Sequence, residues 1–400
     1  MASYGIDVLC SNCADSPLKI FDIARRQDKF VYACAPMVRY SKLAFRQTVR
    51  KYGTDICWTP MILAKEFNRN SFARDSDLTI ATEGPKCPTI VQFGANSPLE
   101  LSRAASLAAP FVDGVDLNCG CPQSWACAET LGAALMNERG LVRDMVVETR
   151  QRLAQDGWHV GKEKDINSTQ GRSVSVKIRV HDDLRKTMDF IDTVIGHPQD
   201  RNIDWITIHP RTRSTPSTTP IRTEALEILT SKYAGTLPVL LSGDIFDLGS
   251  LPFKAFGPQG KQQSATFTTK DDPISGHSFP PQVNGTTTMP KPSNTGLSGF
   301  MSARGLLVNP GLFSGSPACT WEVLETFMCN VARCPLPLKL VVHHVQEMCS
   351  PGLGGDKTSL LSKKDRIKLT ELTSMIELID FLDEKIEEQT GQAGGLRRDL

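Results

Sequence analysis

Eight short apolar runs, most of them followed by turn residues and a helical pattern, constrain the fold of this chain more than any other feature. They occupy residues 30–36, 55–61, 88–94, 112–118, 174–180, 204–210, 237–243 and 297–303. Several are continuously apolar, as strands buried on both faces are. Helical patterns such as "SKLAFRQTVRKYG" and "PLELSRAASLAAP" lie between them. This alternation predicts an α/β fold, either a (β/α)8 TIM barrel or a doubly wound sheet. The count of eight, and the polar residues that end most runs, favour the barrel.

Two segments interrupt this alternation. Residues 157–173 are polar and predict a surface insertion before the fifth strand. Residues 253–297 are rich in Ser, Thr, Pro, Gly and Gln, and cannot bury enough apolar surface to order themselves. We expect that segment to be disordered, and the seventh helix of the barrel to be shortened or missing. The expected organisation is an N-terminal extension over residues 1–29 and a barrel over residues 30–318.

The pattern after the barrel is wholly helical. Residues 319–390 predict a small C-terminal all-helical domain, and residues 391–400 a flexible tail. In the last helical pattern an apolar residue recurs every three to four positions, at Leu369, Leu372, Ile376, Ile379 and Leu382. We expect these residues to form one apolar stripe of an amphipathic helix.

Composition excludes several classes of protein. The 400 residues are 40% hydrophobic and 22% charged, and no apolar run approaches the length of a membrane span. The N-terminus lacks the basic and apolar regions of a secretory signal. Twelve scattered cysteines predict reduced thiols, and hence a protein of the cytoplasm or the nucleus.

Charge is nearly balanced overall, at +1, but it is not evenly distributed. Between Lys19 and Arg74 there are twelve Lys and Arg residues against four Asp and Glu. A basic segment of this kind either faces a polyanion or is a solvated charged surface.

The stretch "VDLNCGCPQSWACAETLGAAL" holds Cys119, Cys121 and Cys127. A structural zinc site needs four ligands, and no second cluster or His pair accompanies these cysteines, so we expect no metal. A redox pair needs two residues between its cysteines, whereas Cys119 and Cys121 are separated by one. The loop follows the fourth strand, at the barrel end where catalytic groups are mounted. We therefore interpret Cys121 as a reactive thiol, and Cys119 and Cys127 as structural ones.

Other strand ends carry matching polar groups. Gln92 ends the third strand, Lys177 and Arg179 the fifth, and His209 the sixth, with Arg211 after it. The last two strands end in "SGDI" and "SARGLL", at the usual phosphate site of this fold. Small residues and Arg304 before a helix suit an anion held by backbone N–H groups and a guanidinium. A phosphate-bearing cofactor at the barrel mouth is the natural inference, and flavin mononucleotide (FMN) fits it.

Six motifs resemble those of the tRNA-dihydrouridine synthases. They are "APMVRYSKLAFR", "VQFGAN", "DLNCGCPQ…LGAALM", "VKIRV", "IHPRT" and "GFMSARGLLVNP", in this order between Phe30 and Met348. "TPMILAKEFNRN" and "CPLPLKLVVHH" are most similar to the eukaryotic subfamily that acts on D-loop uridines 20a and 20b.

The resemblance implies an FMN-binding TIM barrel, a helical domain that helps to bind tRNA, NADPH as reductant, and no obligate protein partner. It implies cofactor contacts for a set of strand-end residues: Pro36, Met37, Val38, Gln92, Lys177, His209, Ser242, Gly243, Asp244, Ala303 and Arg304. Ala303 stands where the family commonly has glycine, a small intrusion. Asn118, Arg179 and Arg211 are the expected substrate contacts.

The implied chemistry follows from the resemblance and from the residues together. NADPH reduces FMN, the reduced flavin delivers hydride to C6 of uracil, and Cys121 donates a proton to C5. Two alternatives stay open. One is an FMN barrel that acts on free pyrimidines, of the dihydropyrimidine or dihydroorotate type. The other is a non-catalytic RNA-binding barrel, although such a protein has no physical reason to keep Gln92, Cys121, Lys177 and His209 together.

Overall fold

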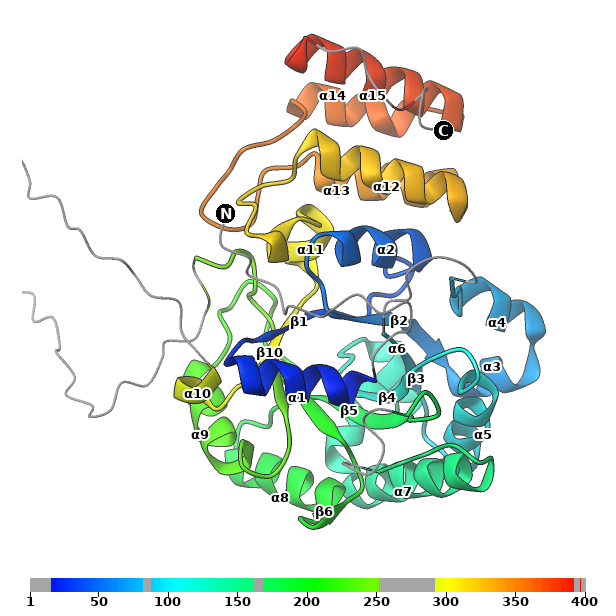
Figure 1. Cartoon of the computed structure of the whole chain (residues 1–400), viewed down its shortest axis with the longest axis vertical. Coiled ribbons are helices and arrows are strands. Elements are labelled where there is room, and N and C mark those ends of the chain that lie inside the picture. Colours follow the sequence, from blue (N-terminus) through cyan, green and yellow to red (C-terminus); the bar gives the residue numbers. More distant parts are fainter. Residues whose placement is uncertain are drawn as a thin grey trace, which may run out of the picture.

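Eight parallel strands close into a barrel in this computed structural model, which describes residues 16–81, 88–161, 168–249, 251, 292–391 and 396 (Figure 1). Each strand pairs with the next along the chain, and the last pairs with the first. All eight predicted runs are strands, so the barrel is confirmed and the doubly wound sheet is excluded. The strands are β1 (Val31–Cys34), β2 (Ile56–Leu63), β3 (Thr89–Gly94), β4 (Gly114–Cys119), β5 (Ser173–Arg179), β8 (Trp205–His209), β9 (Val239–Ser242) and β10 (Gly299–Ser302).

Helices surround the strands, as the alternating pattern predicts. They are α2 (Leu43–Lys51), α3 (Ala64–Arg69), α4 (Ser71–Asp77), α5 (Pro98–Ala108), α6 (Ser124–Ala128), the 3-10 helix η1 (Gly132–Asn137), α7 (Arg139–Gln155), α8 (Leu184–Ile195), α9 (Thr223–Tyr233), α10 (Pro292–Thr295), α11 (Arg304–Val308) and the 3-10 helix η2 (Leu312–Ser314). A short antiparallel ribbon of β6 (Gly196–His197) and β7 (Asp200–Arg201) follows α8. Between β9 and β10 the described residues contain one helix, the four-residue α10, as expected for a shortened seventh helix. The expectation of disorder covers residues 253–297, of which residues 253–291 lie outside the described residues; for the last part it is wrong, because residues 292–295 form α10.

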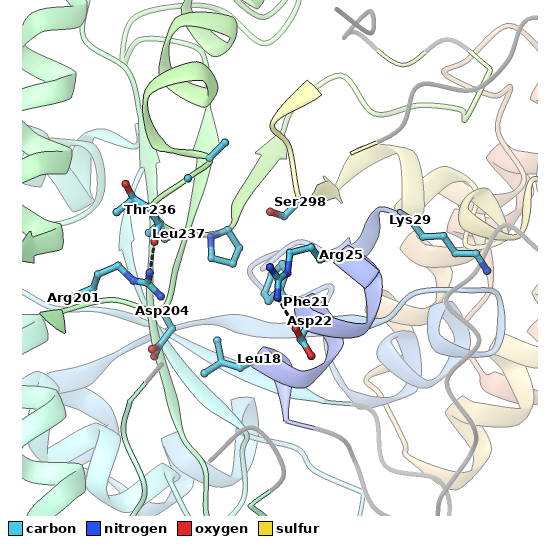
Figure 2. Close-up of a pocket in the computed structure, with 13 residues that line it drawn as sticks. Leu18, Phe21, Asp22, Arg25, Lys29, Arg201, Asp204, Thr236, Leu237 and Ser298 are labelled. Atoms are coloured by element: carbon cyan, nitrogen blue, oxygen red, sulfur yellow. Dashed lines mark hydrogen bonds and ion pairs between the residues drawn. The ribbon is translucent and has the colours of Figure 1, made fainter. Parts of the chain in front are cut away.

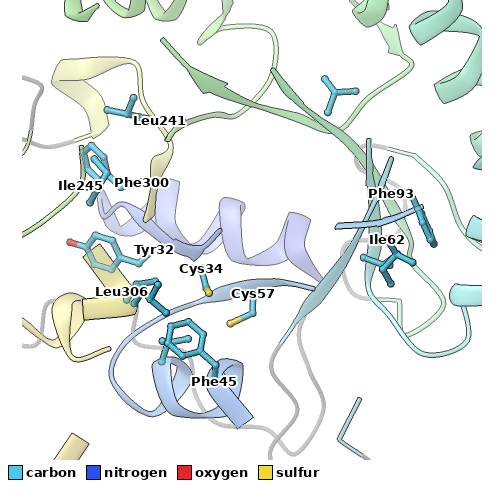
Figure 3. Close-up of a cluster of buried hydrophobic side chains, with 14 of the residues drawn as sticks. Tyr32, Cys34, Phe45, Cys57, Ile62, Phe93, Leu241, Ile245, Phe300 and Leu306 are labelled. Atoms are coloured by element: carbon cyan, nitrogen blue, oxygen red, sulfur yellow. The ribbon is translucent and has the colours of Figure 1, made fainter. Parts of the chain in front are cut away.

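The hydrophobic core lies mainly between the outer face of the strands and the surrounding helices. Figure 3 shows part of it, with Cys34 of β1 and Cys57 of β2 next to Phe45 of α2. Tyr32 stacks on Phe313 at 4.5 Å between ring centroids, which joins β1 to η2. Because successive residues of a strand face opposite sides, the alternate residues of the same strands line the barrel interior.

The floor of the barrel is closed by α1 (Pro17–Gln27), a helix that the sequence interpretation did not recognise within the N-terminal extension. Its Phe21 packs against Trp205 at 5.4 Å, in an apolar cluster with the first interior residues of the strands. A pocket of about 320 Å3 lies beside α1, between Arg25 on one side and Arg201 and Thr236 on the other (Figure 2). This pocket is at the N-terminal ends of the strands, opposite the polar strand ends.

A repeated pair of hydrogen bonds joins the starts of neighbouring strands. The Asp55 carboxylate accepts the Tyr32 N–H at 2.8 Å, and the Asp55 N–H donates to the Tyr32 carbonyl at 2.8 Å. Asp113 makes the same two bonds between β3 and β4, and Asp204 makes them between β5 and β8. Burial raises the pKa of Asp55 to about 7. These residues fix the register of strand pairs at the barrel floor.

Four helices follow the barrel and extend from it beyond α2 and α11 (Figure 1). They are α12 (Trp321–Arg333), α13 (Leu338–Met348), α14 (Lys363–Lys368) and α15 (Met375–Thr390), with the 3-10 helix η3 (Leu369–Glu371) between the last two. Asn330 of α12 donates to the Thr48 hydroxyl of α2 at 3.0 Å, so this group of helices is docked on the barrel. None of the helices that the structure describes has the length and apolarity to cross a membrane.

The predicted apolar stripe after Lys368 is wrong in two respects. The chain does not continue as one helix, because Ser374 begins a new helix by accepting the Glu377 N–H at 3.2 Å. The side chains that face inward from α15 are Leu378, Leu382 and Ile386, whereas Ile376 is 72% exposed. The break rotates the second helix, so positions before and after it no longer share one face.

Candidate functional site

The loop after β4 holds the Cys121 thiol at the C-terminal end of the barrel. The Asn118 side-chain carbonyl accepts the N–H groups of both Gly120 and Cys121 at 2.9 Å. On the other side of the loop, the Arg179 Nε donates to the Gly120 carbonyl at 2.8 Å. Cys121 is partly exposed, whereas Cys119 is fully buried and burial raises its thiol pKa well above the ordinary value. Of these two cysteines, Cys121 is the one placed for chemistry.

A hydrogen-bonded chain inside the barrel leads to this loop. The Asp116 carboxylate accepts from Gln92 Nε2 at 2.7 Å and from the Ser175 hydroxyl at 2.6 Å. The Gln92 side-chain carbonyl in turn accepts from the Asn118 amide at 2.8 Å. Asp116 is fully buried, and burial raises its pKa to about 6. The sequence interpretation missed this residue, although a lone carboxylate within an apolar strand was a signal for it.

These hydrogen bonds hold the Gln92 side chain inside the barrel. Its side chain is fully buried, and both ends of its amide are engaged, one by Asp116 and one by Asn118. Gln92 connects the barrel interior to the residue that holds the cysteine loop. Its amide keeps a second N–H, so the expected hydrogen bond to a flavin ring stays a prediction.

Lys177 lies beside this chain, on β5 and in register with Asn118. Burial lowers the pKa of its ammonium to about 8, and the Asp116 carboxylate opposes that shift. Within the part of the chain that the structure describes, no hydrogen bond or ion pair engages this ammonium group. Lys177 is thus a partly buried cation that lacks an acceptor.

Two of the expected substrate contacts, Arg179 and Arg211, have hydrogen-bond partners within the protein. Arg179 is 9% exposed, and besides the Gly120 carbonyl it binds the Thr212 carbonyl at 2.6 Å. Arg211 is 2% exposed and forms a bidentate ion pair with Asp244 at 2.6 and 2.8 Å. These guanidinium groups position loops at the strand ends, and the substrate contacts expected of them stay predictions.

His209, at the end of β8, is held in one tautomer. Arg211 Nη1 lies 3.0 Å from His209 Nε2, and since a guanidinium only donates, Nε2 must be the acceptor. Burial is the main cause that lowers the pKa of His209, and together with the nearby cations Lys177, Arg179 and Arg211 it brings this pKa to about 2. The ring is therefore neutral at physiological pH, with its proton on Nδ1. A Cβ at Gly243 would lie 2.8 Å from this ring, so a glycine is required there.

The ends of β9 and β10 meet around Arg304. Its guanidinium is half-exposed, 3.7 Å from the Asp244 carboxylate. The N–H groups of Arg304 and Gly305, in the first turn of α11, make no hydrogen bond to any other described residue. A Cβ at Gly305 would lie 2.2 Å from the Ile245 carbonyl, so only glycine lets this turn approach β9. A guanidinium and two N–H groups can hold an anion here, whereas the Asp244 carboxylate orients the cations.

The remaining expected contacts lie around the same end of the barrel. Ser242 is buried at the end of β9, and Ala303 precedes α11. After β1, the Met37 N–H donates to the Ser41 hydroxyl at 3.0 Å, and Val38 is 50% exposed beside the partly buried Pro36. Within the described residues, no three His, Cys, Asp or Glu side chains gather as metal ligands would.

The basic segment between Lys19 and Arg74 does not form one surface. Arg25 and Arg26 lie on α1 at the barrel floor and pair with Asp22. Arg46 is 2% exposed and binds the Ser41 carbonyl at 2.7 Å. Of the two readings of this segment, the placement of these residues favours separate charged positions over one polyanion-binding face.

Comparison with known proteins agrees with this arrangement. The family described as "Dihydrouridine synthase (Dus)" matches residues 33–254. The Homo sapiens protein named tRNA-dihydrouridine(20a/20b) synthase (NAD(P)+)-like is 33% identical over 378 residues, which cover 94% of this chain and 95% of that protein. The tRNA-dihydrouridine(20a/20b) synthases of Schizosaccharomyces pombe and Saccharomyces cerevisiae are each 32% identical; the matches cover 92% and 89% of this chain, and 91% and 80% of those proteins. The chain therefore belongs to the dihydrouridine synthase family.

Proposed function

We propose that this protein is a tRNA-dihydrouridine synthase that reduces the C5=C6 bond of D-loop uridines at positions 20a and 20b. The observation that carries the proposal is the Cys121 thiol, held at the barrel mouth through Asn118 and Arg179. The relatives named for positions 20a and 20b match nearly the whole chain. Two alternatives from the sequence, the free-pyrimidine enzyme and the non-catalytic barrel, find no comparable support.

The residues present fit FMN as cofactor and NADPH as reductant. Lys177 lacks an acceptor, which a flavin ring offers through its carbonyl oxygens and ring nitrogens. Arg304 and the two N–H groups of the first turn of α11 suit the ribityl phosphate, because a guanidinium and a helix N-terminus both favour an anion. A bound flavin supplies the hydride for C6 of uracil, which comes ultimately from NADPH.

Cys121 holds the proton that reaches C5. The neutral His209 has its lone pair turned to Arg211, so His209 Nε2 cannot donate a proton. Proton transfer from a positioned acid accelerates a reaction by about 10²–10⁴.

Asn118 and Lys177 orient the substrate beside this thiol. The Asn118 carbonyl is occupied by the cysteine loop and one of its N–H groups by Gln92, so one N–H remains for a uracil oxygen. The Lys177 ammonium stabilises negative charge that develops on the ring during reduction. In this proposal Cys121 donates the proton, the Asn118 amide binds uracil, and Lys177 stabilises the negative charge.

tRNA reaches this site by extruding the target uridine, since a flavin in the barrel mouth cannot contact a stacked base. The exposed Arg39 and Arg213 follow β1 and β8 at the mouth and suit phosphate contacts. We assign the helices α12–α15 to binding the body of the tRNA. We also propose the cytoplasm or the nucleus as the location, where the free thiols of this chain would stay reduced.

The proposal is tested by measuring dihydrouridine in tRNA from cells with and without the gene, using mass spectrometry of D-loop fragments. We expect a loss confined to positions 20a and 20b. Unchanged tRNA, together with a flavin-containing protein that oxidises NADPH, would contradict the proposal and favour a free-pyrimidine enzyme.

A further inference from the structure

We propose that Gly132 is a positioning residue, whose missing side chain sets the place of the Cys121 thiol. Gly132 begins η1 with a φ of +59°, in the left-handed region. A Cβ added there would lie 2.7 Å from the Cys121 Cβ and 2.6 Å from the Cys121 carbonyl oxygen. The Cβ of Cys121 carries the thiol, so any side chain at position 132 would collide with the atom that aims it. This inference rests on the proposed function.

The Cys121 backbone cannot easily move away from such a collision. Its N–H donates to Asn118 at 2.9 Å, and its carbonyl accepts the Ala133 N–H at 2.8 Å. The Cys127 thiol donates to the same carbonyl at 3.7 Å. Relief of the contact would break at least one of these bonds. The hydrogen bond from the Ala133 N–H to the Cys121 carbonyl also joins η1 directly to Cys121. It therefore keeps the backbone at Gly132 in contact with Cys121.

The expected effect is specific to proton transfer. The three atoms nearest to the position of a Cβ on Gly132 all belong to Cys121, so a substitution there acts on this residue first. A misplacement of a reacting group by about 1 Å costs on the order of 10²-fold in rate. The expected cofactor contacts, Lys177 and Arg304, lie at the ends of other strands, so the substitution should leave their positions unchanged.

The experiment compares Gly132→Ala with Gly157→Ala in the full-length, flavin-loaded protein. Gly157 also has a positive φ, +88°, but a Cβ there would meet nothing within 4 Å, so this control reproduces the backbone strain without the contact. Four quantities are measured: bound flavin, the rate of flavin reduction by NADPH, single-turnover dihydrouridine formation with its solvent isotope effect, and the rate of Cys121 alkylation by iodoacetamide.

We expect Gly132→Ala to keep its flavin and its rate of reduction by NADPH, and to form dihydrouridine about 10²-fold more slowly with a larger solvent isotope effect. Its Cys121 alkylation rate should differ from the wild-type rate, whereas Gly157→Ala should match the wild type in all four measurements. Gly132→Asn, which tolerates positive φ better, replaces the alanine variant if that variant does not fold.

Wild-type turnover in Gly132→Ala would overturn the inference, and so would equal losses in both glycine variants. Parallel loss of flavin and turnover would also overturn it, because the effect would then be structural. Failure of the proposed function is recognised separately: the wild-type protein itself would form no dihydrouridine, while the alkylation rate would still report on the contact between Gly132 and Cys121.

Discussion

The Asn118 side-chain carbonyl accepts the backbone N–H of Cys121 at 2.9 Å. The amide expected to hold the uracil therefore also fixes the loop that carries the thiol. Because Asn118 is itself held by Gln92, and Gln92 by Asp116, the proton donor and the substrate amide form one connected unit with the barrel interior.

Replacement of Cys121 by alanine should separate the two halves of the reaction. We expect the variant to bind flavin and to be reduced by NADPH at the wild-type rate, since Cys121 is not among the expected cofactor contacts. Dihydrouridine formation should fall by about 10²–10⁴, the usual contribution of a positioned acid. Rapid mixing of the reduced variant with tRNA measures this rate, with the structural thiol variant Cys349→Ala as the control.

Asp116→Ala should destabilise the protein and disconnect the cysteine loop. The substitution leaves the Gln92 amide and the Ser175 hydroxyl without their buried acceptor, at a cost of about 1–3 kcal/mol for each donor. Urea unfolding measures the lost free energy, and turnover per bound flavin measures the effect on the loop. Turnover equal to wild type in the folded variant would show that the interior chain does not support catalysis.

Arg304→Ala should weaken flavin binding without unfolding the barrel, because this guanidinium is half-exposed. A charge-assisted hydrogen bond contributes about 1.5–3 kcal/mol, so we expect affinity to fall by roughly 10- to 150-fold. The yellow absorbance of the purified protein and titration with FMN measure the change. Arg213→Ala, at an exposed site on a neighbouring loop, should keep its flavin; an Arg304→Ala protein as yellow as wild type would exclude the phosphate role.

His344 should make stability depend on pH. It is fully buried where α2, α12 and α13 meet, with Phe327 4.9 Å and Phe45 5.1 Å from its ring. Burial lowers its pKa to about 3, below the value of about 6.5 in the unfolded chain. The unfolded chain therefore takes up the proton first, and stability is lost as pH falls from about 6.5 towards 3.

His344→Leu removes this dependence. Between pH 7.5 and 5.5, the unfolding free energy of the wild type should fall relative to that of the variant by about 1.4 kcal/mol. The two proteins must be compared at each pH, because other buried groups also titrate. The raised pKa of Asp55, for example, makes the folded protein less stable as pH rises. Urea unfolding at the two pH values provides the measurement, with the exposed His197→Leu as control. Parallel pH profiles for wild type and His344→Leu would contradict the assignment.

The strands and the main site residues were predictable because they depend on local pattern. A strand buried on both faces must be apolar, and alternation within it decides which residues face the interior. Asn118 and Lys177 are register partners on neighbouring strands, and Arg179 pairs with His209 in the same way. Their convergence at one end of the barrel follows from the parallel direction of the strands.

The partners of charged residues were not predictable in the same way. Arg211 is buried because Asp244, 33 positions later, turns its carboxylate towards it, and no pattern in the sequence reports that pairing. The hydrogen bonds that join Gln92 to Asp116 and Asn118 were not predictable for a similar reason, since no local pattern reports them. The break before α15 depends on a single cap at Ser374, which outweighed a helical periodicity that looked continuous.

One single-turnover experiment decides whether Cys121 donates the proton to C5 of uracil. Wild-type protein and Cys121→Ala, each loaded with flavin and reduced with NADPH, are mixed with unmodified tRNA, and dihydrouridine is measured by mass spectrometry. We expect product at positions 20a and 20b with the wild type, and a rate that is at least about 10²-fold slower with the variant. Equal rates for the two proteins would contradict the assignment of Cys121 as proton donor, and no product with either would contradict the proposed reaction.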